Sequence, residues 1–252
     1  MKEKIYEIPL NDAMDAGEEC PFCFLERKTE QELMDFVLGS CASYMESDTR
    51  ESTDREGFCR MHQKKMFEYG NALGNGWILK TYYKKLIKEM KEEFQGFAPG
   101  KTSFKDRLKG KTGNVNSIQA WVGEKEKSCY ICNRYSERYV RYLATFFHLY
   151  KKDSAFRDKL KAGKGFCLHH FGDLCQSADQ YLSDGERKEL YSIIFHLMEQ
   201  NMERVSGDID WFIEKFDYVN KDAGWKDSRD AVQRGMQKIR GGYPGDPVYR
   251  IK

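Results

Sequence analysis

Apolar residues recur every three or four positions over most of this chain, which is the spacing that gathers them on one face of an α-helix. No segment alternates apolar and polar residues in the manner of a half-buried strand. The last helical stretch is long and has a capping box at its start, because Ser183 and Glu186 have the S-x-x-E form. The pattern predicts an all-α fold, with helices over residues 25–44, 59–94, 135–150 and 171–182 and a long helix that begins after Ser183 and continues to Phe216.

Two segments interrupt this periodicity. Residues 46–56 contain no apolar side chain and are predicted to form a connection, while residues 96–123 are rich in glycine and are predicted to form a linker. Beyond Lys221 the apolar content falls, which predicts a loosely attached tail. The predicted organisation is a first helical repeat, a Gly-rich basic linker, a second repeat with the long helix, and a C-terminal extension, at residues 1–95, 96–123, 124–220 and 221–252.

The net charge of the chain gives information about which classes of partner it could bind. The 252 residues carry 42 Lys and Arg against 40 Asp and Glu, so the net charge of +2 does not point to nucleic acid or an acidic membrane surface for the whole chain. Residues 84–111 are locally basic, with nine Lys and Arg against four Asp and Glu, a local net charge of +5. We expect neither a signal peptide nor a membrane span, and therefore a cytoplasmic protein.

Eight Cys and His residues form a pattern that occurs twice. Each copy has a C-x-x-C pair and, downstream, a G-F-C-x-x-H element, and the copies are offset by 109 residues at the first motif and 108 at the second. A buried cysteine with no special role would give no reason for histidine to follow cysteine at the same spacing in both copies. The candidate metal ligands are Cys20, Cys23, Cys59, His62, Cys129, Cys132, Cys167 and His170.

Three thiolates and one imidazole make a Cys3His set, which suits tetrahedral zinc. In a reducing compartment, cysteines grouped in this way favour metal ligation over disulfides. We therefore predict two zinc ions per chain, with an iron-sulfur cluster as the alternative cofactor. Because protein fills all four positions, each site is predicted to be structural.

We expect each copy to form its own site, so that Cys20 and Cys23 would share an ion with Cys59 and His62. The second site would use the corresponding residues of copy two, where the spacing of copy one selects His170 over His169. The expected geometry resembles a treble-clef zinc finger, in which a C-x-x-C knuckle faces the first turn of a helix. The duplication also predicts a pseudo-twofold arrangement of the two halves.

The C-P-x-C element at residues 20–23, the two G-F-C-x-x-H elements and the segment at residues 210–218 resemble an uncharacterised bacterial family of unknown function, domain-of-unknown-function family 6062. The resemblance covers most of the chain. Copy two departs from the pattern, because Tyr130 stands where copy one has Pro21. The resemblance implies that the chain is a member of this family, and it implies no activity.

Three functional hypotheses follow. The first is a non-enzymatic helical zinc protein whose surface binds a protein or a small-molecule ligand, since the sequence has no Ser-His-Asp, paired-carboxylate or Gly-rich catalytic signature. The second is a metal-dependent redox protein or enzyme that uses an iron-sulfur or a labile zinc-thiolate site. The third is nucleic-acid binding through the basic region at residues 84–111.

Overall fold

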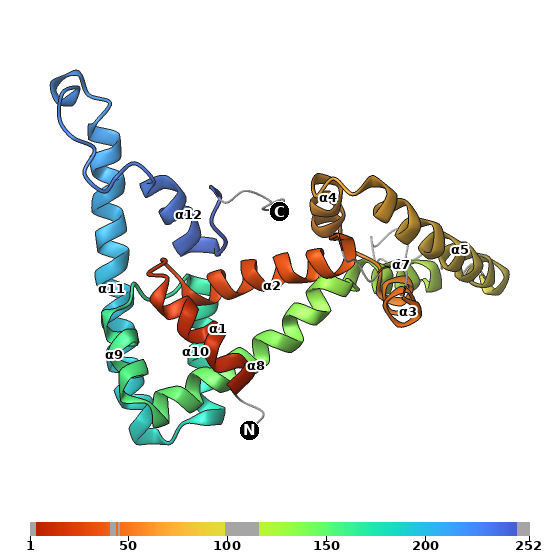
Figure 1. Ribbon diagram of the computed structural model, residues 1–252, viewed down its shortest axis with the longest axis horizontal. Coiled ribbons are helices and arrows are strands. Elements are labelled where there is room, and N and C mark those ends of the chain that lie inside the picture. The colour runs from red at the N-terminus through yellow and green to blue at the C-terminus, as the bar shows by residue number, and fades with distance from the viewer. Residues whose placement is uncertain (1–3, 41–43, 45, 99–115, 246–252) are drawn as a thin grey trace, which may run out of the picture. The chain divides into compact units, whose positions relative to one another are not determined.

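The computed structural model describes residues 4–40, 44, 46–98 and 116–245. All regular secondary structure among these residues is helical, which confirms the predicted all-α fold (Figure 1). None of the helices in this part of the chain is long and apolar enough to cross a membrane.

The chain forms two compact units that are not consecutive in sequence. Among the described residues, unit 1 contains residues 4–29 and 136–245, and unit 2 contains those between 30 and 135. Two helices, α2 (Pro21–Leu38) and α8 (Tyr130–Lys152), supply residues to both units. The units therefore do not follow the consecutive repeats at residues 1–95 and 124–220, and each unit takes one part from each copy.

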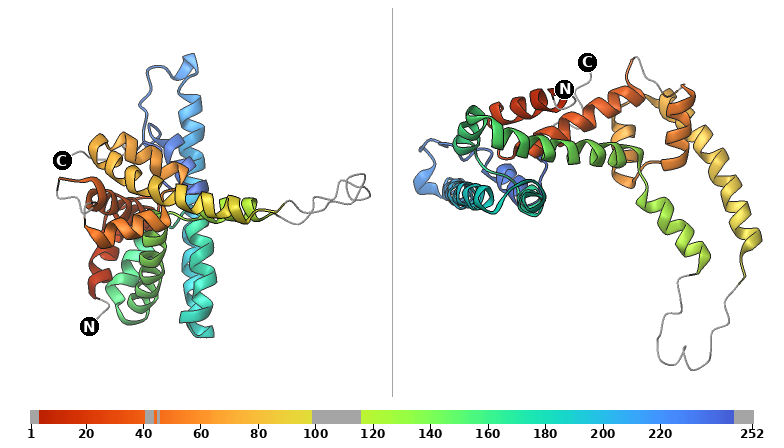
Figure 2. Two further views of the ribbon diagram at one scale, coloured as in Figure 1. Left: turned by 90° about the vertical axis from the view of Figure 1, so that its right-hand side faces the viewer. Right: turned by 90° about the horizontal axis from the view of Figure 1, so that it is seen from below.

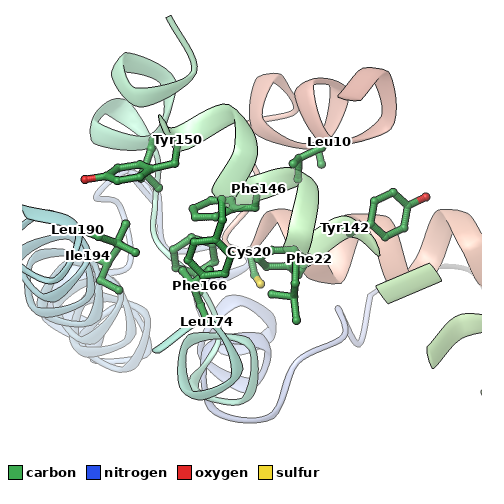
Figure 3. Packing of buried hydrophobic residues seen from close by; sticks show 14 of the residues in the cluster. Leu10, Cys20, Phe22, Tyr142, Phe146, Tyr150, Phe166, Leu174, Leu190 and Ile194 are labelled. Atoms are coloured by element: carbon green, nitrogen blue, oxygen red, sulfur yellow. The ribbon is translucent and has the colours of Figure 1, made fainter. Parts of the chain in front are cut away.

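Unit 1 is built around buried aromatic rings. Phe146 is fully buried and contacts Phe22, Phe156 and Phe166 at ring-centroid distances of 5.9, 5.4 and 6.2 Å. Cys20 lies among these side chains, next to Phe22 (Figure 3). The helices that belong wholly to this unit are α1 (Lys4–Asp15), α9 (Ser154–Ala162), α10 (Leu168–Tyr181), α11 (Asp184–Glu214) and α12 (Ala231–Arg240).

The long helix α11 is continuous over 31 residues (Figure 2). Its predicted capping box is present, because the Ser183 hydroxyl accepts from the Glu186 backbone N–H and the Glu186 carboxylate accepts from the Ser183 backbone N–H. These two bonds satisfy donors that a helix start would otherwise leave unpaired. The sequence therefore located the start of this helix correctly.

The C-terminal segment corrects the prediction of a loosely attached tail. Residues 231–240 form α12, which packs against α10 and α11. The buried face of this helix is largely polar, because Gln237 and Lys238 are each 1% exposed while the apolar Met236 and Ile239 are exposed. The aliphatic stem of lysine packs like an apolar residue when its ammonium group finds partners.

Unit 2 contains α3 (Ser47–Glu56), α4 (Arg60–Glu68), α5 (Ala72–Gly96) and α7 (Ser117–Lys127). Its core joins α2, α4, α5 and the start of α8 through Met34, Met66, Ile78 and Ile131. Helix α7 packs along α5 (Figure 2). The predicted linker is thus helical at its described C-terminal end, and residues 99–115 lie outside the described residues.

The polar run at residues 46–56 is a helix, which corrects the prediction of a connection. Helix α3 packs on α5 through polar contacts rather than an apolar stripe. Thr53 is buried, and Asp54 accepts a hydrogen bond from Thr81 at 2.7 Å. Glu56 accepts from Asn133 at 2.8 Å. Tertiary hydrogen bonds of this kind are invisible to a search for hydrophobic periodicity.

Candidate metal centres

Each of the four Cys motifs lies at the N-terminus of a helix. Cys59 and Cys167 are the N-cap residues of α4 and α10, while Cys20 and Cys129 immediately precede α2 and α8. In every motif the carbonyl of the first cysteine accepts from the backbone N–H four residues later. The C-x-x-C elements are therefore first helical turns rather than the knuckles of a treble-clef finger. A helix N-terminus carries a partial positive charge, which favours thiolates there.

Site 1 consists of Cys20, Cys23, Cys167 and His170 and lies within unit 1. The Nδ1 atom of His170 is 3.4 Å from Cys20 Sγ, 3.5 Å from Cys23 Sγ and 3.2 Å from Cys167 Sγ. The sulfurs of Cys23 and Cys167 are 3.7 Å apart. The site joins the start of α2 to the start of α10.

Site 2 consists of Cys59, His62, Cys129 and Cys132 and lies within unit 2. The Nδ1 atom of His62 is 3.2 Å from Cys59 Sγ, 3.3 Å from Cys129 Sγ and 3.4 Å from Cys132 Sγ. The sulfurs of Cys59 and Cys132 are 3.9 Å apart. The site joins the start of α4 to the start of α8.

This grouping corrects the expectation that each copy forms its own site. The C-x-x-C pair of copy one meets the C-x-x-H pair of copy two, and the C-x-x-C pair of copy two meets the C-x-x-H pair of copy one. The inner two motifs of the chain thus form site 2, and the outer two form site 1. The spacing of three residues brings two donors together within one helical turn, but it does not determine which helix start lies opposite.

The glycine of each G-F-C-x-x-H element turns the chain into the site. Gly57 and Gly165 have φ of +62° and +75°, a backbone conformation that residues with a β-carbon rarely adopt. The Gly57 carbonyl accepts a hydrogen bond from the Tyr130 N–H at 2.9 Å. Pro21 holds the corresponding position in copy one and has no N–H to donate. The difference between Tyr130 and Pro21 therefore changes one backbone contact next to the site.

Both clusters have the dimensions of a site for a single tetrahedral ion. Zinc–sulfur bonds of about 2.3 Å and zinc–nitrogen bonds of about 2.0 Å imply separations of about 3.8 Å between two sulfurs and about 3.5 Å between sulfur and nitrogen. The measured separations are 3.7 and 3.9 Å between sulfurs and 3.2–3.5 Å between sulfur and nitrogen. Within each cluster all ligand atoms lie within 4.8 Å of one another. An iron-sulfur cluster binds its ligands through several iron atoms and holds them farther apart.

The thiols and imidazoles share protons unequally within each cluster. Burial opposes ionisation of Cys129, yet the hydrogen bond and positive charge of His62 lower the pKa of this thiol to about 6. Burial also disfavours the charged imidazole, but the neighbouring thiolates and Glu30 raise the pKa of His62 to about 10. In site 1, hydrogen bonds from Cys20 and Cys23 lower the pKa of Cys167. Without a metal ion, each cluster therefore pairs a thiolate with a protonated imidazole, His62 in site 2 and His170 in site 1. A divalent cation that binds to the cluster displaces these protons.

Helix α2 orients the histidine of site 2 through Glu30. The carboxylate of Glu30 lies 2.9 Å from His62 Nε2, and Lys65 donates to both of its oxygens at 2.6 and 2.5 Å. Because a carboxylate only accepts, His62 donates from Nε2, and its Nδ1 atom faces the three sulfurs, where it can ligate a metal ion once it has lost its proton. Tyr139 occupies the equivalent position on α8, seven residues after Cys132, and packs its ring 5.4 Å from that of His170.

His169 and His170 differ in exposure to solvent, as the spacing of copy one predicted. His170 is 1% exposed within site 1, whereas the His169 side chain is 66% exposed and lies 3.5 Å from Asp173. No sequence pattern pointed to Lys65 or to the contact of the C-terminal segment with site 1, and Glu30 was not among the predicted site residues. One signal was available for Glu30, since it lies two helical turns beyond Cys23 on a helix that starts with a ligand pair.

Replacing Glu30 with alanine is expected to weaken the binding of added zinc at site 2 by about tenfold to a hundredfold, because partners of this kind orient the ligating imidazole and raise its basicity. Competition with a chromogenic chelator measures the effect, and only one of the two ions should bind more weakly. Glu32→Ala changes an exposed residue of the same helix and is the matched control. Equal affinities for Glu30→Ala and Glu32→Ala would contradict the orienting role.

Comparison with known proteins gives a family and no activity. Neither the curated proteins nor the solved structures contain a match to this chain. Residues 1–246 match the family of unknown function DUF6062, a range that includes all eight residues of the two clusters. The chain therefore belongs to the family of unknown function DUF6062.

Proposed function

We propose that the protein binds one zinc ion in each of its two Cys3His clusters and is a non-enzymatic helical module that binds a protein or a small-molecule ligand. The observation that carries the proposal is the pair of complete donor sets, each with the spacing of a single tetrahedral ion. A set of four protein donors leaves no coordination position for a substrate, as is typical of structural zinc. Each ion would hold two helix starts together.

The state of the cysteines supports a cytoplasmic location. All seven cysteines among the described residues are free thiols, including Cys175, which belongs to neither cluster. A reducing compartment keeps such thiols available for metal. Cys41 lies outside the described residues.

A cavity in unit 2 supports ligand binding. It has a volume of about 210 Å³ and is lined mainly by apolar side chains of α4 and α5, including Met66, Ile78, Leu79 and Tyr82. Phe67 borders it and is 81% exposed. Such a cavity suits one small apolar group, either from a free ligand or from a side chain of a partner protein.

The alternative hypotheses receive less support from the described residues. The spacing within both clusters suits one ion better than an iron-sulfur cluster. In the basic region at residues 84–111, Glu92 is 3.9 Å from Lys88 and Glu89 is 2.5 Å from Lys125, which offsets part of the positive charge on α5. Residues 99–111 lie outside the described part of the chain. The hypothesis of nucleic-acid binding therefore rests mainly on the basic residues at 99–111.

Elemental analysis of the purified full-length protein tests the proposal. We expect two zinc ions per chain, and we expect a strong chelator to remove them with a loss of helical circular dichroism, because structural zinc contributes directly to folding free energy. The same chelator saturated with zinc beforehand is the control. Protein with almost no zinc, whose helicity does not change in the chelator, would refute the proposal.

A further inference from the structure

The two clusters share one donor set but differ in access to solvent. In site 1 the four ligands are buried, with Cys20 and Cys167 at 0% exposure, His170 at 1% and Cys23 at 2%. In site 2 Cys129 is 1% exposed, but Cys59 and Cys132 are only half-buried. Two ligand residues of site 2 are therefore partly exposed to solvent, whereas all four ligand residues of site 1 are buried.

The C-terminal segment accounts for the protection of site 1. Gly241 follows α12 with φ of +78°, and a β-carbon at this position would lie 3.4 Å from Cys167 Sγ and 3.5 Å from Cys23 Sγ. The backbone therefore covers both sulfurs. Lys238 fixes this segment in place, because its buried ammonium group donates to the carbonyl oxygens of Glu19 and Lys164. All of these residues belong to unit 1.

The sulfurs of the two partly exposed cysteines of site 2 lie close to each other. Cys59 Sγ and Cys132 Sγ are 3.9 Å apart, one at the start of α4 and the other in the first turn of α8. A disulfide requires a separation of about 2.0 Å, so the sulfurs need to approach by about 2 Å.

We propose that site 2 is an oxidative modification site, at which a peroxide converts Cys59 and Cys132 to a disulfide and releases the metal ion. The inference deepens the proposed function, because it assigns different roles to two zinc sites of the same composition. Site 1 is the permanent structural site, and site 2 responds to oxidant.

The reaction balances with peroxide as the only oxidant. One thiolate attacks a peroxide oxygen, the O–O bond breaks, and a sulfenic acid and hydroxide form. The second thiolate attacks the sulfenic sulfur, which forms the S–S bond and expels a second hydroxide. Two protons from solvent convert the hydroxides to two waters. The sulfurs together lose two electrons, which reduce the peroxide.

Loss of two thiolates leaves only Cys129 and His62 as donors, too few to retain zinc at a closed site. The released ion gives the modification a measurable product. Release of the ion also removes the link that the metal forms between α4 and α8. The new disulfide links the same two helices in its place. Reduction with a dithiol in the presence of zinc should restore the site.

Titration of the full-length protein with hydrogen peroxide, in the presence of a chromogenic zinc chelator, tests the inference. We expect one of two zinc ions to be released at least tenfold faster than the other, and peptide mass mapping to show a Cys59–Cys132 disulfide. Release of both ions at the same rate, or mapping of the first disulfide to Cys23 and Cys167, would overturn it.

Two variants assign the released ion. A variant in which Cys20, Cys23, Cys167 and His170 are all alanine keeps only site 2 and should lose its zinc rapidly in peroxide. A variant in which Cys59, His62, Cys129 and Cys132 are all alanine keeps only site 1 and should resist. If the purified wild type contains no zinc, the proposed function and the metal release both fail, and the disulfide map then decides only whether Cys59–Cys132 forms before any other disulfide.

Discussion

A variant in which Cys20, Cys23, Cys167 and His170 are replaced by alanine is expected to keep one zinc ion per chain. A variant in which Cys20, Cys23, Cys59 and His62 are replaced is expected to keep none. Both remove three cysteines and one histidine, so they differ only in which motifs they combine. The structure groups the outer motifs at site 1 and the inner motifs at site 2. The first variant therefore leaves site 2 complete, while the second leaves only two donors at each site.

We expect the zinc contents of the two variants to differ by almost one whole ion per chain. Structural zinc sites bind with about 10–16 kcal/mol, and a site with two of its four donors loses most of this. Elemental analysis after gel filtration measures the content directly, with the wild type as the reference for two ions. Pairing within each copy predicts the reverse result, with no zinc in the first variant and one ion in the second. That outcome would show that the crossed arrangement is wrong.

Glu19→Gln is expected to destabilise unit 1 by about 3 kcal/mol, the second-largest effect that we anticipate. Glu19 is 2% exposed and accepts from Arg204 at 2.7 and 2.6 Å, and Lys238 Nζ lies 3.2 Å from its carboxylate. Burial raises the pKa of Glu19, but Arg204 and Lys238 outweigh it and lower the pKa, so the carboxylate is ionised. An uncharged glutamine would leave the buried ammonium group of Lys238 without its counter-charge.

Urea unfolding followed by hydrogen exchange of α11 and α12 measures this loss within unit 1. Glu18→Gln is the matched control, since the neighbouring Glu18 pairs with Arg27 at a partly exposed position and should cost less than about 1 kcal/mol. The double variant Glu19→Leu with Lys238→Met removes both charges and should recover part of the stability. Equal stabilities of Glu18→Gln and Glu19→Gln would contradict a central role for the buried carboxylate.

Sequence patterns predicted the local features of this chain well. Helical periodicity predicted the fold class, and the pair Ser183 and Glu186 marked the start of α11, because both signals depend on residues within a few positions of each other. Two polar helices escaped prediction. Helix α3 packs through Thr53 and Asp54 and has no apolar residue. Helix α12 has apolar residues at helical spacing, but Met236 and Ile239 are exposed and the helix packs through Lys238.

The sequence by itself determined which eight Cys and His residues come together in groups, because a spacing of three residues at a helix start aligns two donors on one face. Only the tertiary structure decided which motifs meet. That choice depends on how α2 and α8 place their first turns opposite α10 and α4, and contacts between residues up to 150 positions apart leave no periodic trace in the chain. The same reason explains why the cover that Gly241 provides over site 1, and hence the unequal exposure of the two sites, became visible only in the folded protein.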